Sequence, residues 1–220
     1  MSPPPAASVP PGGRRGRDAS TAGPRVVVGL GNPGPKYAGH RHNVGAMAVA
    51  HLAREYGETL RAHRTRCLIA QVRIPPAPDS GAGVALPVPV VLAQPTTYMN
   101  EAGGPVRALL DYFSVNSRSL LVVHDDLEID FGTIRFKAGG GAAGHNGLRA
   151  LASALGTPDF GRVRIGIGRP PGRQDAAAYV LHDFSRVEHR DLPLLFAQAR
   201  DEIEGRVVVA RSSRTDAGRD

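Results

Sequence analysis

A histidine and a carboxylate that lie far apart in the sequence could together perform acid–base chemistry. His42 lies in GHRHNVG (39–45), directly before a predicted helix, and an imidazole titrates near neutral pH, as a general base requires. Asp125 ends the β-branched run SLLVVHD (119–125). A carboxylate there could accept a hydrogen bond from the imidazole, fix its tautomer and stabilise the imidazolium. A lone histidine more often has a structural role, so this prediction depends on the two side chains meeting.

Three asparagines lie in polar loops at the ends of the predicted elements: Asn32 in GLGNPG, Asn100 in QPTTYMNEAGG and Asn146 in GGGAAGHNG. An uncharged amide offers both donors and an acceptor, so together they could bind a peptide main chain or a carbonyl oxygen that gains charge. The local sequence also allows plainer roles. Asn32 could be a turn residue, and the other two could cap helices.

Water is the nucleophile that the sequence favours. The chain contains neither the G-x-S-x-G motif of serine hydrolases nor the H-E-x-x-H motif of zinc peptidases. Its one cysteine, Cys67, lies in a predicted strand without a neighbouring group that would activate a thiol.

A dinucleotide site is one alternative, because Gly29, Gly31 and Gly34 satisfy G-x-G-x-x-G directly after a strand. That motif also requires a helix that begins at the loop and an acidic residue at the end of the second strand. Here the loop continues to Arg41, and the next predicted strand (67–74) ends without Asp or Glu. Both observations weaken the prediction of a bound NAD or FAD.

A metal site is a second alternative, because hard cations favour oxygen ligands and the chain carries Asp125, Asp126, Glu128 and Asp130 in one short stretch. The plainer interpretation is a solvated acidic turn, which we expect for the last three. A third alternative is an RNA-binding protein without catalytic activity. The presence of both His42 and Asp125 argues against it.

The composition indicates a globular protein with an anionic partner. The chain has 220 residues, 41% of them hydrophobic, which suffices for one domain with its own core. No run approaches the roughly 18 apolar residues of a membrane span. A single cysteine excludes an intrachain disulfide and favours a reducing compartment. The net charge of +7 favours a polyanion such as nucleic acid, although charge also serves solubility.

Short β-rich runs alternate with helical stretches, which predicts an α/β domain with a mixed, mostly parallel twisted sheet and helices on both faces. Strands are predicted at 25–31, 67–74, 88–94, 119–125, 133–139 and 162–168. Helices are predicted at 43–57, 105–114 and 147–156, with one or two more between 174 and 211.

Glycines and prolines mark the segments outside these elements. Residues 1–24 are rich in Pro, Gly and Arg and lack aromatic residues, so we expect a disordered tail. We expect the folded domain to span 25–211, a surface hairpin loop at 75–87, and a flexible C-terminus at 212–220.

Four segments together resemble bacterial peptidyl-tRNA hydrolases, in the order and at the spacing of that family. They are GLGNPGPKYAGHRHNVG, QPTTYMNEAG, HDDLEIDFGTIRFKAGGGAAGHNGL and FGRVRIGIGRP. The resemblance extends from about Arg25 to about residue 205 and omits the tail and the 75–87 loop. It implies hydrolysis of the ester between a peptide and the 3′ end of tRNA, without metal or cofactor, by a cytoplasmic monomer whose partner is tRNA.

The resemblance also implies roles for individual residues. His42 corresponds to the catalytic base and Asp125 to the carboxylate that orients it. The remaining positions bind substrate: Asn32, Asn100 and Asn146 hold the substrate and water, Tyr37 and Tyr98 line the site of the tRNA 3′ end, and Lys137 and Arg164 bind the 5′ phosphate.

Two departures from the family pattern concern the rim of the site. His40 replaces a residue that is commonly small and polar in the family. Ala142 and Ala143 lie in the glycine-rich loop where some members carry His and Gly. Neither departure removes a residue with an implied chemical role.

Overall fold

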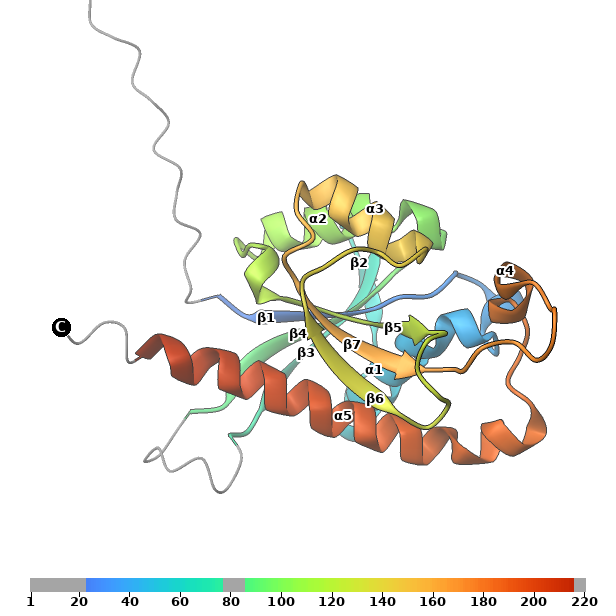
Figure 1. Cartoon of the computed structure of the whole chain (residues 1–220). Coiled ribbons are helices and arrows are strands. Elements are labelled where there is room, and N and C mark those ends of the chain that lie inside the picture. The colour runs from blue at the N-terminus through green and yellow to red at the C-terminus, as the bar shows by residue number, and fades with distance from the viewer. Residues whose placement is uncertain (1–22, 77–85, 216–220) are drawn as a thin grey trace, which may run out of the picture.

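The structure is a computed structural model that describes residues 23–76 and 86–215, and of 209–215 only the backbone. Most of the predicted N-terminal tail, the central part of the 75–87 loop and residues 216–220 lie outside the described residues. The described part of the chain forms one α/β unit (Figure 1).

A seven-stranded sheet in the order β2-β3-β4-β1-β5-β7-β6 forms the centre of the fold. The pairs β1–β4, β1–β5 and β5–β7 are parallel, whereas the pairs at the two edges are antiparallel. The sheet is therefore mixed, as predicted. The strands are β1 (Arg25–Gly29), β2 (Arg61–His63), β3 (Cys67–Ile74), β4 (Val88–Pro95), β5 (Leu120–Asp126), β6 (Ile134–Ala138) and β7 (Gly161–Gly166).

All six predicted strands are present, with ends that differ from the prediction by at most two residues. The sequence did not reveal β2, because it has only three residues and none of them is buried. It pairs with β3 at the edge of the sheet. Its hydrogen bonds to β3 define it as a strand, because an exposed edge strand lacks the apolar pattern of a buried one. The β3 and β4 ends meet at Ile74 and Val88, so the predicted hairpin connects antiparallel neighbours.

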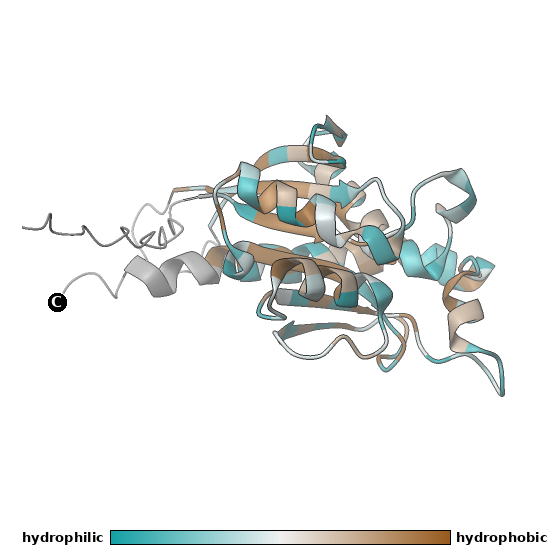
Figure 2. Cartoon of the chain, turned by 90° about the horizontal axis from the view of Figure 1, so that it is seen from above, coloured by the Kyte–Doolittle hydropathy of each residue, from teal (hydrophilic) through white to brown (hydrophobic). Residues whose placement is uncertain are grey.

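Helices cover both faces of the sheet and enclose two apolar cores (Figure 1). Leu52 of α1 and Leu195 of α5 belong to one core, and Leu109 of α2 and Leu151 of α3 to the other. Figure 2 shows hydrophobic residues concentrated in the central strands between these layers. The helices are α1 (Val44–Glu55), α2 (Gly103–Tyr112), α3 (Asn146–Leu155), α4 (Ala176–Val180) and α5 (Arg186–Thr215).

The predicted helices are confirmed, and the C-terminal segment that the sequence could not place contains α4 and α5. Gly156 caps α3 with a left-handed φ of 72°, and Gly57 follows α1 with a φ of 70°. Both positions agree with the predicted helix ends. None of the helices in the described ranges is both long and apolar enough to cross a membrane.

Two glycines let α1 approach the sheet so closely that side chains at its start lie over β5. A Cβ atom on Gly45 would lie 2.1 Å from the carbonyl oxygen of Val123, and one on Gly29 would lie 2.4 Å from the carbonyl oxygen of Gly45. Neither distance can accommodate a side chain. Gly29, the first glycine of the G-x-G-x-x-G pattern, thus serves helix–strand packing together with Gly45, and the 3₁₀ turn that carries His42 is held directly above the end of β5.

We predict that Gly45→Ala lowers the free energy of unfolding by roughly 1–3 kcal/mol, the usual cost of overpacking. The new Cβ would meet the backbone carbonyl oxygen of Val123, which cannot move without the rest of its strand. Urea denaturation would measure this change. Gly104→Ala is the matched control, since its added Cβ has nothing within 4 Å and Ala favours helix. Equal stability of both variants would contradict the proposed packing constraint.

Candidate active site

A cleft of about 830 Å³ opens at the carboxyl ends of the central parallel strands. The chain folds so that residues from segments more than 100 positions apart line one cavity. Of the nine site residues that the sequence predicted, eight line it: Asn32, His42, Tyr98, Asn100, Asp125, Lys137, Asn146 and Arg164. The ninth, Tyr37, packs edge-on against Tyr98, with ring centroids 6.3 Å apart.

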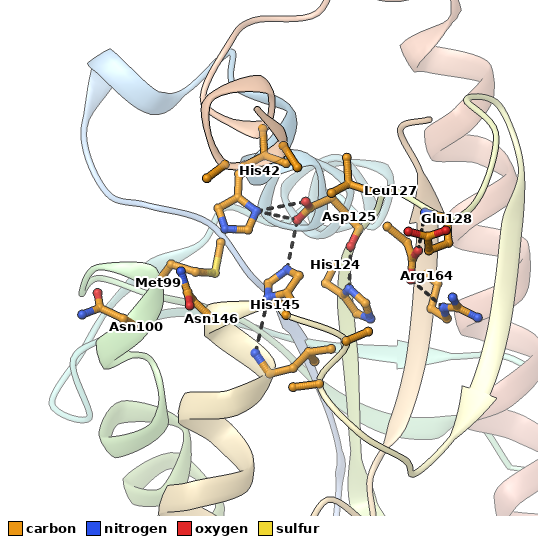
Figure 3. A pocket seen from close by; sticks show the side chains of 18 of the residues that line it. His42, Met99, Asn100, His124, Asp125, Leu127, Glu128, His145, Asn146 and Arg164 are labelled. Atoms are coloured by element: carbon orange, nitrogen blue, oxygen red, sulfur yellow. Dashed lines mark hydrogen bonds and ion pairs between the residues drawn. The ribbon is translucent and has the colours of Figure 1, made fainter. Parts of the chain in front are cut away.

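His42 and Asp125 meet in a buried hydrogen bond. The Nδ1 atom of His42 lies 2.9 Å from Oδ1 and 3.0 Å from Oδ2 of Asp125. An ionised carboxylate accepts only, so Nδ1 carries the proton and Nε2 keeps its lone pair. Figure 3 shows Nε2 on the side of the ring where Met99 and Asn100 lie. The imidazole is therefore oriented to accept a proton from a group in the cleft.

Burial and charge act in opposite directions on the pKa of His42. Desolvation disfavours the imidazolium and lowers the pKa, whereas the charge and hydrogen bond of Asp125 raise it, and the net result is a pKa above 6.5. Burial raises the pKa of Asp125, but His145 and His42 lower it more, so the carboxylate stays ionised. Asp125 therefore stabilises protonated His42, which is the state that a general base reaches when it takes up a proton.

A second histidine, His145, binds the same carboxylate, although no pattern in the local sequence indicated a role for it. Its Nε2 lies 3.1 Å from Oδ1 of Asp125, while its Nδ1 accepts the backbone N–H groups of Gly147 and Leu148 at the start of α3. These bonds place the proton on Nε2. His145 is thus the N-cap of α3, a position that the sequence analysis considered for Asn146, and it links that helix to Asp125.

Asn43 holds the loop that carries Asn32. Its Oδ1 accepts the backbone N–H of Asn32 at 2.9 Å, and its Nδ2 donates to the Asn32 carbonyl oxygen at 2.9 Å. Asn43 occupies the N-cap position of α1, but its side chain makes these bonds instead of capping. The Oδ1 atom of Asn32 accepts the N–H of Met99 at 2.9 Å, which leaves its Nδ2 donors for the cleft.

Asn100 and Asn146 are exposed at the rim of the cleft, and neither caps a helix. Asn100 lies within the 3₁₀ turn Met99–Glu101, and α2 begins only at Gly103. Asn146 is the first residue of α3 rather than its cap. The interpretation of both as capping residues is therefore wrong.

Arg41 ties the turn that contains His42 to the segment between α4 and α5. Its buried guanidinium donates to the carbonyl oxygen of Asp183 and pairs with Glu188 at 2.6 Å, and it stacks on the ring of Tyr179 at 4.4 Å. The neighbouring His40 forms an isolated β-bridge with Asp183. His40, which differs from the family pattern, thus contributes to the same contact between this turn and the segment before α5.

Two of the three acidic residues after Asp125, namely Asp126 and Glu128, are paired with arginines. Asp126 accepts from Nε of Arg164 at 2.7 Å, and Glu128 pairs with Arg169 at 2.6 Å. The expectation that both are only solvated is therefore wrong. Asp126 fixes the guanidinium of Arg164 at the wall of the cleft, which Lys137 of the adjacent strand β6 also lines.

The geometry does not favour the cofactor and metal alternatives. The glycine-rich loop leads into the 3₁₀ turns Pro35–Tyr37 and Arg41–Asn43, and α1 begins at Val44, so no helix starts where a pyrophosphate would bind. Within the described residues, the one group with metal-ligand spacing is His42, Asp125 and His145. Their nitrogen and oxygen atoms already bond to one another and to the start of α3.

Comparison with known proteins identifies the family. The model of the peptidyl-tRNA hydrolase family matches residues 26–215. This chain belongs to the peptidyl-tRNA hydrolase family. It is 51% identical over 182 residues to the peptidyl-tRNA hydrolase of Frankia alni, with 83% of this chain and 87% of the relative covered. Identity to that of Kineococcus radiotolerans is 50%, with 83% and 90% covered.

Solved structures agree with this assignment. The crystal structure of peptidyl-tRNA hydrolase from Acinetobacter baumannii superimposes with a TM-score of 0.68 at 31% sequence identity, and the match covers 88% of this chain and 91% of that one. The chain is therefore a hydrolase of peptidyl-tRNA, and the fold and function that the sequence predicted are confirmed.

We predict that the rate falls at acidic pH with an apparent pKa higher than that of an ordinary histidine, because the raised pKa keeps His42 protonated, and inactive as a base, to a higher pH. In Asp125→Asn the carboxylate that raises this pKa is lost and desolvation remains. The acidic limb should therefore move to lower pH while the maximal rate falls. Profiles of kcat/KM against pH would show both effects, and an unmoved limb would contradict the coupling.

Proposed function

We propose that His42 is the general base of peptidyl-tRNA hydrolysis. The observation that carries this proposal is the buried hydrogen bond of 2.9 Å between His42 Nδ1 and Asp125. In this mechanism His42 Nε2 removes a proton from water, and the oxygen attacks the ester carbonyl. Asp125 stabilises the imidazolium, which returns the proton to the departing ribose oxygen, so that a free peptide and tRNA result.

We assign substrate binding to the amides around this base. Asn32 supplies N–H donors from a loop fixed by Asn43, and Asn100 and Asn146 supply amides at the rim. Donors that are already in place stabilise a developing oxyanion without a cost for reorganisation during the reaction. Uncharged amides also favour a peptide nitrogen over the charged amine of aminoacyl-tRNA, which would be desolvated without a partner.

Lys137 and Arg164 are proposed to bind the 5′ phosphate, with Tyr37 and Tyr98 near the 3′ end. Both cations line the same cleft as His42, and Tyr98 is 53% exposed there, with Tyr37 behind it. An arginine held by a carboxylate loses less conformational freedom when it binds a phosphate. Asp126 therefore acts as a positioning residue for Arg164.

The remaining features of the proposal concern the state of the enzyme. We propose a monomer that acts in the cytoplasm, needs no obligate protein partner, and requires neither a metal nor a cofactor. The domain boundaries at 25 and 211 are part of the same proposal. The hydrogen bonds that already engage the Asp125 carboxylate and both ring nitrogens of His145 leave Nε2 of His42 as the available ligand atom of this group, which supports metal independence.

We predict that His42→Ala lowers kcat on N-acetyl-aminoacyl-tRNA by about 10²–10⁴-fold, the usual contribution of a general base, while tRNA binding persists. The assay is run with EDTA, which should leave the unmodified enzyme active. His189→Ala is the control, since His189 is exposed and does not line the cleft. Full turnover in His42→Ala, or loss of activity with EDTA, would refute the mechanism.

We predict that Lys137→Ala lowers the slope of log Kd for tRNA against log salt concentration by roughly 0.7–0.9, the value for one neutralised phosphate. Arg164→Gln is combined with Asp126→Asn, so that no carboxylate is left without its partner, and should have a similar effect. A minimal substrate that contains only the 3′-terminal nucleotide should be cleaved at nearly the normal rate. An equal loss on that substrate would contradict phosphate binding.

A further inference from the structure

Arginines and aromatic rings gather at the edge of the sheet opposite to β6, outside the cleft. The turn between β2 and β3 and the end of α2 bring together five residues, which we call the hairpin patch. They are Arg61, His63, Arg64, Arg66 and Tyr112. The residues come from two segments about 50 positions apart, so the patch is a product of the fold rather than of one charged run.

Stacking fixes the arginine at the centre of the patch. The guanidinium of Arg64 lies 4.5 Å from the centroid of the Tyr112 ring, and the ring of His63 meets Tyr112 edge-on at 4.6 Å. Stacking uses the face of the guanidinium and leaves its N–H edge available. Arg64 is therefore preorganised to donate hydrogen bonds to an anion in solvent.

The positive charge of the patch is not compensated within the described part of the chain. Arg61, Arg64 and Arg66 are exposed, and none of the ion pairs found among residues 23–76 and 86–208 involves them. The acidic residue beside Tyr112, Asp111, faces Arg107 instead. Three unpaired cations on β2 and the turn that follows it provide electrostatic attraction for a polyanion.

The patch is joined to the cleft through the backbone. Thr96 donates both its N–H and its hydroxyl to the carbonyl oxygen of Arg66, at 2.9 Å each. Two residues later Tyr98 lines the cleft. Arg66 itself has a left-handed φ of 59°, a conformation that this tight turn requires. The turn thus presents its arginines at a fixed distance from the site.

The hairpin patch and the proposed phosphate site lie on the same face of the sheet. His63 is opposite Cys67, whose side chain belongs to the core on the α2 and α3 face of the sheet. Arg162 is opposite Val122, which belongs to the same core, so Arg162 also points to the α2 and α3 face. Arg164 and Lys137 share the face of Arg162 by strand alternation and register. Six strand spacings of about 4.8 Å separate the two edges, roughly 29 Å in all.

We propose that the hairpin patch binds the sugar–phosphate backbone of the tRNA, on the opposite side of the cleft from Lys137 and Arg164. RNA suits it because every nucleotide supplies a phosphate, so a molecule that spans the cleft reaches both edges. An acidic peptide would supply carboxylates only in particular sequences. The proposal deepens the proposed function, since it adds a second anchor for the same substrate.

Binding of deacylated tRNA at several KCl concentrations tests the proposal independently of catalysis. Arg64→Gln combined with Arg66→Gln should flatten the plot of log Kd against log salt by roughly 1.4–1.8, or 0.7–0.9 for each lost phosphate contact. The control, Arg54→Gln with Arg190→Gln, removes two exposed arginines of α1 and α5 and the same net charge. Its slope should change much less, and equal slopes for the two pairs would overturn the proposal.

A second variant separates stacking from charge. Tyr112→Leu keeps every arginine but removes the ring under Arg64, so it should weaken tRNA binding measurably at unchanged thermal stability. Cleavage of the minimal 3′-end substrate should be unaffected in all three variants, which distinguishes failure of this proposal from failure of the mechanism. A loss confined to substrates with acidic peptides would instead show that the patch binds the peptide and would refute the RNA assignment.

Discussion

The buried carboxylate of Asp125 is the centre on which the site depends. It accepts hydrogen bonds from two imidazoles, those of His42 and His145, and each imidazole belongs to a different segment of the chain. A carboxylate with little exposure is expensive to desolvate unless charged or polar groups satisfy it. The folded state therefore requires both histidines to be in place, and the stability of the site and its chemistry rest on the same contacts.

The two imidazoles serve Asp125 in different ways. His42 points its second nitrogen into the cleft, whereas the second nitrogen of His145 is occupied by backbone N–H groups of α3. A third histidine, His124, is buried beside them and donates to the backbone carbonyl of Asp125 at 2.7 Å. Burial and the nearby His145 lower its pKa to about 3, so it stays neutral. One imidazole of the three is thus available to exchange protons with substrate.

Close packing of backbone makes this arrangement possible. Gly29 and Gly45 allow α1 to rest on the ends of β1 and β5, and Asn43 then bonds to the backbone of the adjacent loop. Arg41 ties the same turn to the segment before α5. The general base proposed at His42 lies on a short turn and needs such support, because a displacement of even 1 Å from productive geometry reduces the rate considerably.

Local sequence determined much of this protein. Strand and helix positions followed from β-branched runs and helical spacing, because local periodicity carries that information, and the motifs around His42 and Asp125 indicated both the family and the chemistry. Only the tertiary structure decided the roles of residues whose partners are distant in the sequence. The roles of His145 and Asn43, the pairing of Asp126 with Arg164 and the edge strand β2 each require a neighbour from elsewhere in the chain. Local patterns cannot specify such contacts, because hydrogen bonds and ion pairs form only after the fold brings their partners together.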